Sequence, residues 1–491
     1  MSALTIGSVF RNAARAVPHR AAAALGGRQL TFAEIDVRAD QIARALSARG
    51  ITRGDRVLCW TDTSLDVVPL FAALARMGAV YCPVPANLGA RESLHLMRLA
   101  RPALLIVEAA GASGRQFHTD EFPVLDMPAL SAAADEQPAQ PFPDAAEESD
   151  THVLFFTSGS TGRPKGVMLS HRVNYLRSHP GSQEEPRGAM VCAYPLFHMG
   201  AWTISLQQWQ ARDLVVYVAK PDGRTIVDAV RTHSASRLNG IPAVWQRVLD
   251  TLEAEPEGLL PSIRFADSGT SATPLSLLEA IASACPNACL RVFYGSTEAG
   301  NVASLAGPDV LAKPGSCGVP SQATEVRIDA GTGELCVRGP LLFDGYFGDA
   351  DATTTAIRDG WLHTGDVATV DPDGYLSIAG RLSDIIRTGG EAVAPAEVEA
   401  ALAGLPGVSE VAVVGVPDPR WGELVCAVLV VAGDGPAPTL DGIREWCTGR
   451  IAAFKHPRAL HTMPALPRTP ATGQVQRRLI VTAIQSPEED A

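Results

Sequence analysis

Residues 157–167 read TSGSTGRPKGV, and no other segment constrains the fold of this chain as strongly. The segment follows the apolar run 152–156, HVLFF, which predicts a buried strand. Glycine, serine and threonine at a strand end let backbone N–H groups and hydroxyls surround phosphate oxygens, and Lys165 adds a positive charge. The GxxxxGK[ST] nucleotide loop is excluded because Lys165 follows Gly162 by three residues and precedes Gly166. We therefore predict a phosphate-binding loop of another type, with an ordinary Gly/Ser surface turn as the alternative.

The composition is that of a globular protein with more than one domain. The 491 residues exceed what one compact core holds, and 46% are hydrophobic and 19% charged. No apolar stretch approaches the length of about 18 residues that a membrane span needs. The net charge of −12 argues against a nucleic-acid partner. The first 33 residues contain arginines but no acid, as in a transit peptide, yet no small-residue cleavage motif follows, so an amphipathic first helix is favoured.

The nine cysteines are scattered along the chain. Only Cys285 and Cys289 lie close together, and no histidine completes a metal-ligand set beside them. Reduced thiols in the cytoplasm are the simplest interpretation.

Apolar runs alternate with helical patterns as in a doubly wound sheet. Strands are predicted at 56–60, 79–82, 103–107, 191–195, 214–218, 237–240, 263–267 and 290–293, and helices at 64–77 and 91–100. Residues 120–150 are interpreted as a surface connection, and 322–378 as a small β subdomain. From 383 onward helices at 395–405 and 440–451 alternate with strands at 408–416 and 425–431. The predicted fold is α/β, with a large multi-subdomain N-terminal domain (1–382) and a small α+β C-terminal domain (383–491).

Four further segments have a clear order along the chain: YGSTE at 294–298, GWLHTGD at 360–366, GRLSD at 380–384 with GGE at 389–391, and LPRTP at 466–470. Together with the 157–167 loop they resemble the adenylate-forming superfamily of acyl-CoA synthetases, carrier-loading adenylation domains and beetle luciferases. The resemblance extends from Thr31 to about Leu479. It implies that the C-terminal domain is a mobile lid. It also implies two half-reactions: a carboxylate attacks ATP to give acyl-AMP and pyrophosphate, and a thiol then displaces AMP.

The resemblance implies a role for individual residues of the nucleotide site. Glu298 corresponds to the magnesium-binding carboxylate, a hard oxygen ligand for a hard cation. Tyr294 would stack on adenine, Thr297 would contact the α-phosphate, and Asp366 would accept both ribose hydroxyls beside Arg381. The full set of implied nucleotide-binding residues is Thr157, Ser158, Gly159, Ser160, Thr161, Gly162, Lys165, Gly269, Thr270, Ser271, Tyr294, Gly295, Thr297, Asp366 and Arg381.

The acyl and coenzyme A positions are implied in the same way. His198 occupies the place of a gating residue, and Trp202, Trp245, Asn301 and the loop 268–273 would line the acyl pocket. Gly389 and Gly390 would line the thiol tunnel, and Lys455 would meet coenzyme A phosphates. The alternatives are core packing for His198 and the tryptophans, and a solvated basic face for Lys455. No acidic residue is placed to bind an amino group, so a plain carboxylic acid is preferred over an amino acid.

Two positions depart from the family pattern. Gln474 stands where the family has a lysine that reaches the α-phosphate during adenylation. Glutamine donates a hydrogen bond but cannot neutralise the charge that builds on the phosphoryl oxygens. Ser383 stands at the hinge, where the family usually has aspartate or lysine, so we expect altered energetics of lid rotation.

These observations predict an acyl-CoA ligase that converts acyl-AMP and coenzyme A to acyl-CoA and AMP, with impaired adenylation. Its catalytic positions would be Gln474, His198, Gly390 and Glu298, and it would need Mg²⁺ and ATP only if adenylation is retained. The pattern resembles the non-adenylating acyl-CoA ligases of platensimycin and platencin antibiotic biosynthesis, in which a separate enzyme supplies the adenylate. The alternatives are a complete ATP-dependent synthetase in which Lys455 substitutes, a carrier-protein-loading enzyme, and a catalytically dead acyl-AMP-binding protein.

Overall fold

The computed structural model describes residues 4–85, 88, 90–108, 121–157, 164–183, 187–255, 258–433, 437–469 and 474–485. The chain divides into two compact units. Unit 1 comprises Met1–Glu325 and Val337–Leu362, and unit 2 comprises Val326–Cys336 and His363–Ala491. Most strands of the predicted β subdomain therefore group with the C-terminal segment, and a boundary at 382/383 stays a prediction. Among the described residues, no helix combines the length and apolar character needed to cross a membrane.

The first sheet of unit 1 carries the strand that precedes the predicted phosphate loop. Its strands are, in spatial order, β18 (Gly345–Tyr346), β8 (Lys165–Ser170), β7 (Thr151–Thr157), β4 (Val80–Pro83), β3 (Arg56–Trp60), β5 (Leu104–Val107) and β6 (Val124–Asp126). The parallel strands β3, β4 and β5 are almost entirely buried, as expected for continuous apolar runs covered on both faces. β7 and β8 run antiparallel, with Thr157 opposite Lys165. The two ends of the 158–163 segment are thus held side by side, while 158–163 themselves lie outside the described residues.

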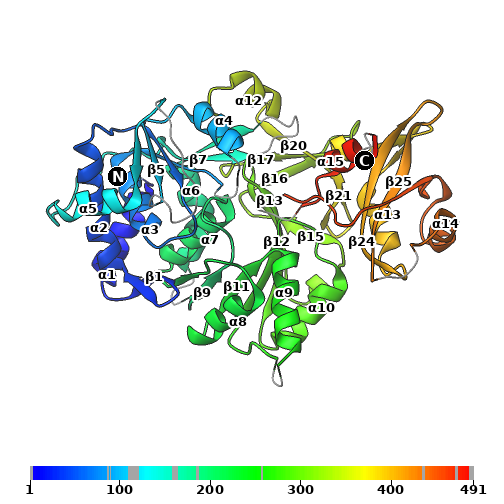
Figure 1. Ribbon diagram of the computed structural model, residues 1–491, viewed down its shortest axis with the longest axis horizontal. Coiled ribbons are helices and arrows are strands. Elements are labelled where there is room, and N and C mark those ends of the chain that lie inside the picture. The colour runs from blue at the N-terminus through cyan, green and yellow to red at the C-terminus, as the bar shows by residue number, and fades with distance from the viewer. Residues whose placement is uncertain are drawn as a thin grey trace, which may run out of the picture. The chain divides into compact units, whose positions relative to one another are not determined.

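The second sheet of unit 1 carries the predicted adenine-binding residues at its strand ends. In spatial order it contains β2 (Arg28–Thr31), β1 (Ala21–Leu25), β10 (Val215–Tyr217), β9 (Met190–Cys192), β11 (Arg237–Gly240), β12 (Phe265–Gly269), β13 (Cys289–Ser296), β14 (Gly300–Ala306) and β15 (Ser316–Pro320). Strands β9 to β13 are parallel, so helices must connect them. These helices are α8 (Gly223–Thr232), α9 (Pro242–Glu253) and α10 (Leu275–Ala284), green in Figure 1. The predicted alternation of strands and helices is confirmed.

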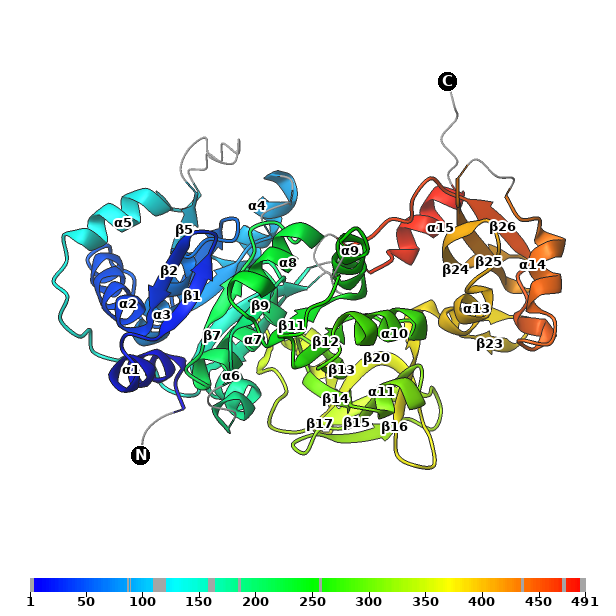
Figure 2. The ribbon, with the colours of Figure 1, turned by 90° about the horizontal axis from the view of Figure 1, so that it is seen from below.

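The helices α1 (Ile6–Ala16), α2 (Phe32–Ser47) and α3 (Val67–Met77) form one group, blue in Figure 2. A buried ion network joins them. The carboxylate of Asp40 accepts hydrogen bonds from Arg11 at 2.8 Å and from Arg76 at 2.6 Å. Removing one partner of such a network leaves a buried charge, which typically costs about 3–5 kcal/mol.

The segment 120–150, predicted as a surface connection, contains regular structure that the prediction did not include. This segment contains β6 and the helix α5 (Met127–Asp135). Asp126 caps the helix by accepting the N–H of Ala129 at 2.6 Å, and Pro128 stands in its first turn, where proline is tolerated. The alanine-rich composition, interpreted as a connection, is that of a good helix former.

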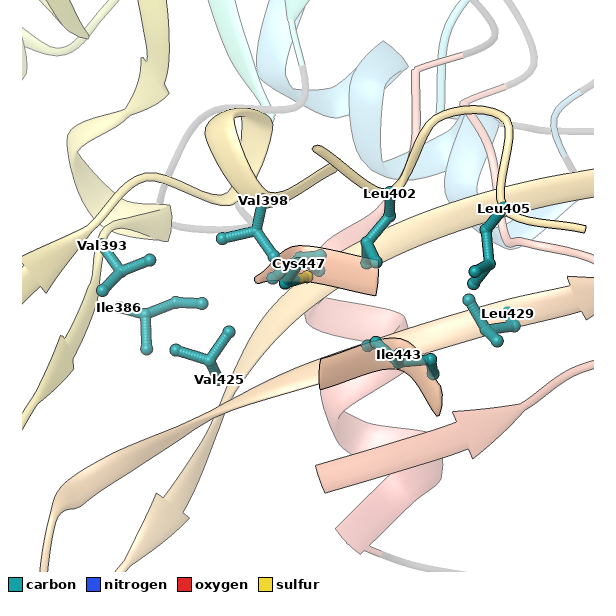
Figure 3. Close-up of a cluster of buried hydrophobic side chains, with 11 residues drawn as sticks. Ile386, Val393, Val398, Leu402, Leu405, Val425, Leu429, Ile443 and Cys447 are labelled. Atoms are coloured by element: carbon teal, nitrogen blue, oxygen red, sulfur yellow. The ribbon is translucent and has the colours of Figure 1, made fainter. Parts of the chain in front are cut away.

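Unit 2 contains two groups of strands. The first is β16 (Glu325–Ile328), β17 (Glu334–Arg338), β20 (Trp361–Val370) and β21 (Leu376–Arg381), in that spatial order. The second is the sheet β23 (Glu391–Val393), β22 (Ile386–Thr388), β25 (Gly422–Val431) and β24 (Val408–Asp418), with β26 (Ala459–Thr462) also paired to β25. Figure 3 shows its core, in which side chains of α13 (Pro395–Leu402) and α14 (Leu440–Cys447) face those of the strands. The predicted α+β character of the C-terminal segment is confirmed.

Two histidines are buried side by side in unit 1 without a carboxylate bonded to either ring. His152 lies in β7 and His171 begins α6 (His171–Ser178), and their ring centroids are 4.5 Å apart. Burial lowers the pKa of His171 to about 4. The pKa of His152 lies well below its usual value, first because the ring is buried and second because a protonated His171 would repel its charge. Both rings are therefore neutral in the folded protein.

This pair predicts acid sensitivity. Below pH 6.5 the unfolded chain binds protons that folded His171 does not bind until about pH 4, so stability is lost as the pH falls through this window. The free energy of unfolding should drop by about 1.4 kcal/mol per pH unit for each such histidine. Urea unfolding at a series of pH values checks this. The His171→Asn variant should show a shallower slope, and a slope unaffected by this substitution would contradict the prediction.

Candidate functional site

A cation, a phenol and a carboxylate come together where the predicted phosphate loop meets β8. The ammonium of Lys165 lies 4.5 Å from the centre of the Tyr346 ring, and the hydroxyl of Tyr346 donates to Glu298 Oε1 at 3.2 Å. This arrangement offers a positive charge for phosphate oxygens and a carboxylate for a divalent cation. Thr157 ends β7 beside it. The remaining predicted loop residues, Ser158, Gly159, Ser160, Thr161 and Gly162, lie outside the described residues.

A buried arginine holds the turn that carries Thr297 and Glu298. Arg177 of α6 donates to the carbonyl oxygens of Thr297 at 3.0 Å, Glu298 at 3.1 Å and Leu341 at 2.9 Å. Burial lowers the pKa of Arg177 to about 10, so the guanidinium stays charged at neutral pH. A Cβ at Gly300 would lie 2.8 Å from Arg177 Nε, so this position requires glycine. Sequence analysis missed Arg177, because nothing in the sequence around an arginine in a helix indicates that its partners are buried carbonyl groups.

The predicted adenine residues lie at the carboxyl ends of two adjacent parallel strands. Gly269 ends β12 opposite Phe293 of β13, and Tyr294 follows directly. Ligands of doubly wound sheets bind at such strand ends. Thr270 adopts a left-handed conformation with φ +66, which is unfavourable for a β-branched residue and is typical of functional loops. A Cβ at Gly295 would lie 2.1 Å from the carbonyl oxygen of Gly300, which explains the glycine; Ser271, next to Thr270, is exposed.

His198 caps the helix α7 (Met199–Gln210). Its Nδ1 accepts the N–H of Gly200 at 3.1 Å, and its ring stacks on Tyr194 with centroids 5.5 Å apart. Burial lowers the pKa of His198 to about 4. Because Nδ1 is an acceptor, the ring is neutral with its proton on Nε2. His198 can therefore donate one hydrogen bond but does not supply positive charge.

The tryptophans predicted for the acyl pocket both have packing roles. Trp202 stacks on Phe71 with centroids 3.9 Å apart and donates Nε1–H to Leu196 O at 2.7 Å. Trp245 is fully buried and donates Nε1–H to Asp267 O at 2.9 Å. Core packing accounts for these contacts, so their part in acyl binding stays a prediction. Asn301 is exposed on β14, and its role stays a prediction too.

In unit 2 the structure brings Asp366 and Arg381 together as cross-strand neighbours of β20 and β21. Arg381 Nε lies 3.0 Å from Asp366 Oδ1, and the Asp366 side chain is 9% exposed. An arginine beside a buried carboxylate favours its ionised form. The pair thus provides a charged acceptor suited to a vicinal diol such as ribose.

Three potential metal ligands meet near this pair. Glu334, Cys336 and His363 place their ligand atoms within 4.8 Å of one another, the one such group found among the described residues. Hydrogen bonds already occupy these atoms: His363 Nδ1 lies 2.8 Å from Glu334 Oε2 and 3.5 Å from Cys336 Sγ. Gly365 N–H also donates to Glu334 Oε1 at 2.9 Å. The three side chains therefore form a hydrogen-bonded group.

The predicted thiol-tunnel loop is the turn between β22 and β23. Gly389 and Gly390 have φ values of +61 and +89, which glycine adopts without strain. Gly389 donates to Trp421 O at 2.8 Å, and a Cβ on Gly389 would lie 2.8 Å from the Trp421 ring. The guanidinium of Arg458 stacks over the same ring at 3.7 Å. Sequence analysis missed Trp421.

Two further predicted site residues, Lys455 and Gln474, lie in unit 2. Lys455 forms an ion pair with Glu397 of α13. Gln474 is exposed, its N–H donates to Thr469 Oγ1 at 3.1 Å, and its carbonyl accepts from Thr469 N at 2.8 Å. At the hinge, Ser383 Oγ donates to Asp384 Oδ1 at 3.1 Å.

Comparison with known proteins assigns a family to this architecture. Residues 10–347 match the AMP-binding enzyme family, and residues 397–472 match the AMP-binding enzyme C-terminal domain. The chain therefore belongs to the AMP-binding enzyme family, which confirms the predicted α/β fold with a large N-terminal and a small C-terminal domain.

Its relatives include acyl-CoA ligases. The chain is 36% identical over 500 residues to a feruloyl-CoA synthase of Amycolatopsis sp, covering 95% of this chain and 97% of that protein. It is 32% identical over 508 residues to a 3-[(3aS,4S,7aS)-7a-methyl-1,5-dioxo-octahydro-1H-inden-4-yl]propanoyl:CoA ligase of Rhodococcus jostii, covering 97% and 98%.

Two solved structures are similar over nearly their whole length. ATP-bound MatB from Rhodopseudomonas palustris has a TM-score of 0.87 at 27% identity, covering 98% of this chain and 99% of that one. o-Succinylbenzoate CoA synthetase (MenE) from Bacillus subtilis, in complex with the acyl-adenylate intermediate OSB-AMP, has a TM-score of 0.85 at 25% identity, covering 96% and 97%.

The Gly389–Gly390 turn gives a test of the predicted thiol tunnel. Within the described part of the chain, no heavy atom lies within 4 Å of a Cβ placed on Gly390, so a larger side chain there meets no described neighbour, although its positive φ strains the backbone. Gly390→Leu should therefore raise the KM for coenzyme A by about tenfold or more, and AMP affinity should stay within about twofold. Gly404→Leu, also at positive φ with no neighbour, is the matched control for backbone strain. Equal loss of both ligands would contradict a tunnel role.

Proposed function

We propose that the protein is an acyl-CoA ligase that acts on a preformed acyl-adenylate and whose own adenylation step is impaired. The relatives named as CoA ligases and synthetases support the thioester chemistry. The neutral, exposed Gln474 carries the second part of the proposal, because the resemblance implies a lysine at this position. The substrate would be a plain carboxylic acid.

The proposed reaction needs few groups from the protein. The coenzyme A sulfur attacks the acyl carbon of the mixed anhydride, a C–S bond forms, the C–O bond to phosphate breaks, and AMP leaves as the thiol loses its proton. Asp366 would hold the ribose, and Thr297, fixed through Arg177, would hold the phosphate. Gly389 and Gly390 would leave room for the thiol. His198, neutral at physiological pH, would donate a hydrogen bond from Nε2 without adding positive charge to the site.

The adenylation half-reaction needs more positive charge from the protein than thioester formation does. Removing one stabilising donor from a transition state typically lowers a rate about 10²–10³-fold. Lys455, the alternative cation, is already paired with Glu397. We infer that a separate adenylating enzyme would then supply the substrate. A cytoplasmic location is proposed because the nine cysteines are scattered along the chain, as is usual for reduced thiols.

A second candidate is a complete ATP-dependent synthetase. The Lys165–Tyr346–Glu298 group favours it, because this group offers ligands for phosphate and Mg²⁺ that a thioesterifying enzyme would not need. The similar MatB structure binds ATP.

Separate assays of the two half-reactions distinguish the candidates. We expect acyl-AMP and coenzyme A to give acyl-CoA at a rate about 10²–10³-fold above ATP-dependent activation of the same acid. Robust pyrophosphate exchange would favour the complete synthetase. Transfer to a phosphopantetheinyl protein in preference to coenzyme A would identify a carrier-loading enzyme, and binding of acyl-AMP without turnover would identify a dead binding protein.

A further inference from the structure

Residues 363, 364 and 365 each contact β17 through a hydrogen bond. Gly365 N–H donates to Glu334 Oε1 at 2.9 Å, and His363 Nδ1 lies 2.8 Å from Glu334 Oε2. Thr364 Oγ1 donates to Leu335 O at 2.7 Å and accepts Asp366 N–H at 3.1 Å. One strand thus holds the three residues directly before the predicted ribose acceptor.

Glu334 is the centre of this arrangement. Its side chain is 9% exposed, and a buried carboxylate is unfavourable unless donors surround it. Both of its oxygens receive a donor from the segment 363–365. The hydrogen bonds that stabilise the buried charge of Glu334 therefore also hold the segment 363–365 in one conformation.

Asp366 depends on that conformation. Gly365 has φ +72, a left-handed conformation that turns the chain directly before Asp366. Arg381 donates to Thr364 O at 3.1 Å while its Nε lies 3.0 Å from Asp366 Oδ1. A shift of the 363–365 backbone would therefore move the carboxylate and its arginine together.

We propose that Glu334 is a positioning residue that orients Asp366 for the ribose hydroxyls of the adenylate. This inference rests on the proposed function, because it assigns Asp366 to ribose. Glu334 itself touches no substrate. It acts by accepting the hydrogen bonds of Gly365 and His363, so that the ordering of the turn is complete before the nucleotide binds.

The test compares three variants by calorimetry with AMP. Glu334→Ala should weaken AMP binding by about tenfold or more, because both turn contacts are lost. Glu334→Gln should stay within about threefold, since its oxygen can accept Gly365 N–H and its amide can donate to the other tautomer of His363. Glu325→Ala, which removes an exposed carboxylate of β16 paired with Arg338, is the matched control and should bind AMP normally.

Two further readouts separate positioning from general destabilisation. Amide exchange of 363–366 should accelerate in Glu334→Ala while the rest of the fold stays protected. The KM for acyl-AMP should rise without a matching change in the KM for coenzyme A. An unchanged AMP affinity in Glu334→Ala, or equal losses in the alanine and glutamine variants, would overturn the inference. Asp366→Ala is measured in parallel, and its failure to weaken AMP binding would instead count against the proposed function.

Discussion

Replacement of Gln474 by lysine is expected to raise ATP-dependent adenylation by about one to two orders of magnitude. The main chain of Gln474 is hydrogen-bonded to Thr469, so the side chain can change without loss of these contacts. A lysine there would add the positive charge that the phosphoryl transfer lacks. Pyrophosphate exchange with the acid measures the effect.

Thioester formation from preformed acyl-AMP should barely change in the same variant. Gln474→Met is the matched control, because it has a similar length and no charge. Equal adenylation by the unmodified protein and the lysine variant, at a rate typical of a complete synthetase, would refute the impairment. If the lysine variant stays inactive, Ser383→Asp should be combined with it, because the hinge also departs from the family pattern.

Asp366→Ala should weaken binding of AMP and acyl-AMP by about tenfold or more, since hydrogen bonds to a charged acceptor contribute about 1.5–3 kcal/mol each. The substitution also removes the partner of Arg381. Calorimetry with AMP measures the loss.

Asp366→Asn is the informative companion variant. It keeps the size of the side chain but can accept through one oxygen only, so its affinity should fall between those of the alanine variant and the unmodified protein. Asp373→Ala, on the turn after β20, is the control. AMP affinity unchanged in Asp366→Ala would remove this residue from the nucleotide site.

Strands and helices with strong local patterns were predictable. The sequence predicts strands at 56–60 and 237–240, and β3 and β11 have these bounds. The helix at 127–135 was missed because proline and acid were taken as signs of a loop, although Asp126 and Pro128 are good helix-start residues. Local patterns fail where the same residue types serve two kinds of structure.

Candidate site residues could be named from the sequence where one segment carries both the chemistry and the position. The resemblance carried by the segments at 294–298 and 360–366 implied Glu298 as a magnesium ligand and Asp366 as the ribose acceptor, Lys165 was predicted from its loop, and these roles stay predictions. The packing of Trp202 against Phe71 was not predictable, because the two residues approach only in the folded chain.

The sequence by itself determined the order of strands and helices, the residue types at the strand ends and the absence of charge at position 474, because these depend on short-range periodicity and on side-chain chemistry. Only the tertiary structure decided which groups hold the site. Arg177 reaches Leu341 across 164 residues of chain, and Glu334 reaches Gly365 across 31. Such hydrogen bonds depend on how strands and helices distant in sequence align. No local pattern records that alignment, since it is set by the packing of the whole unit.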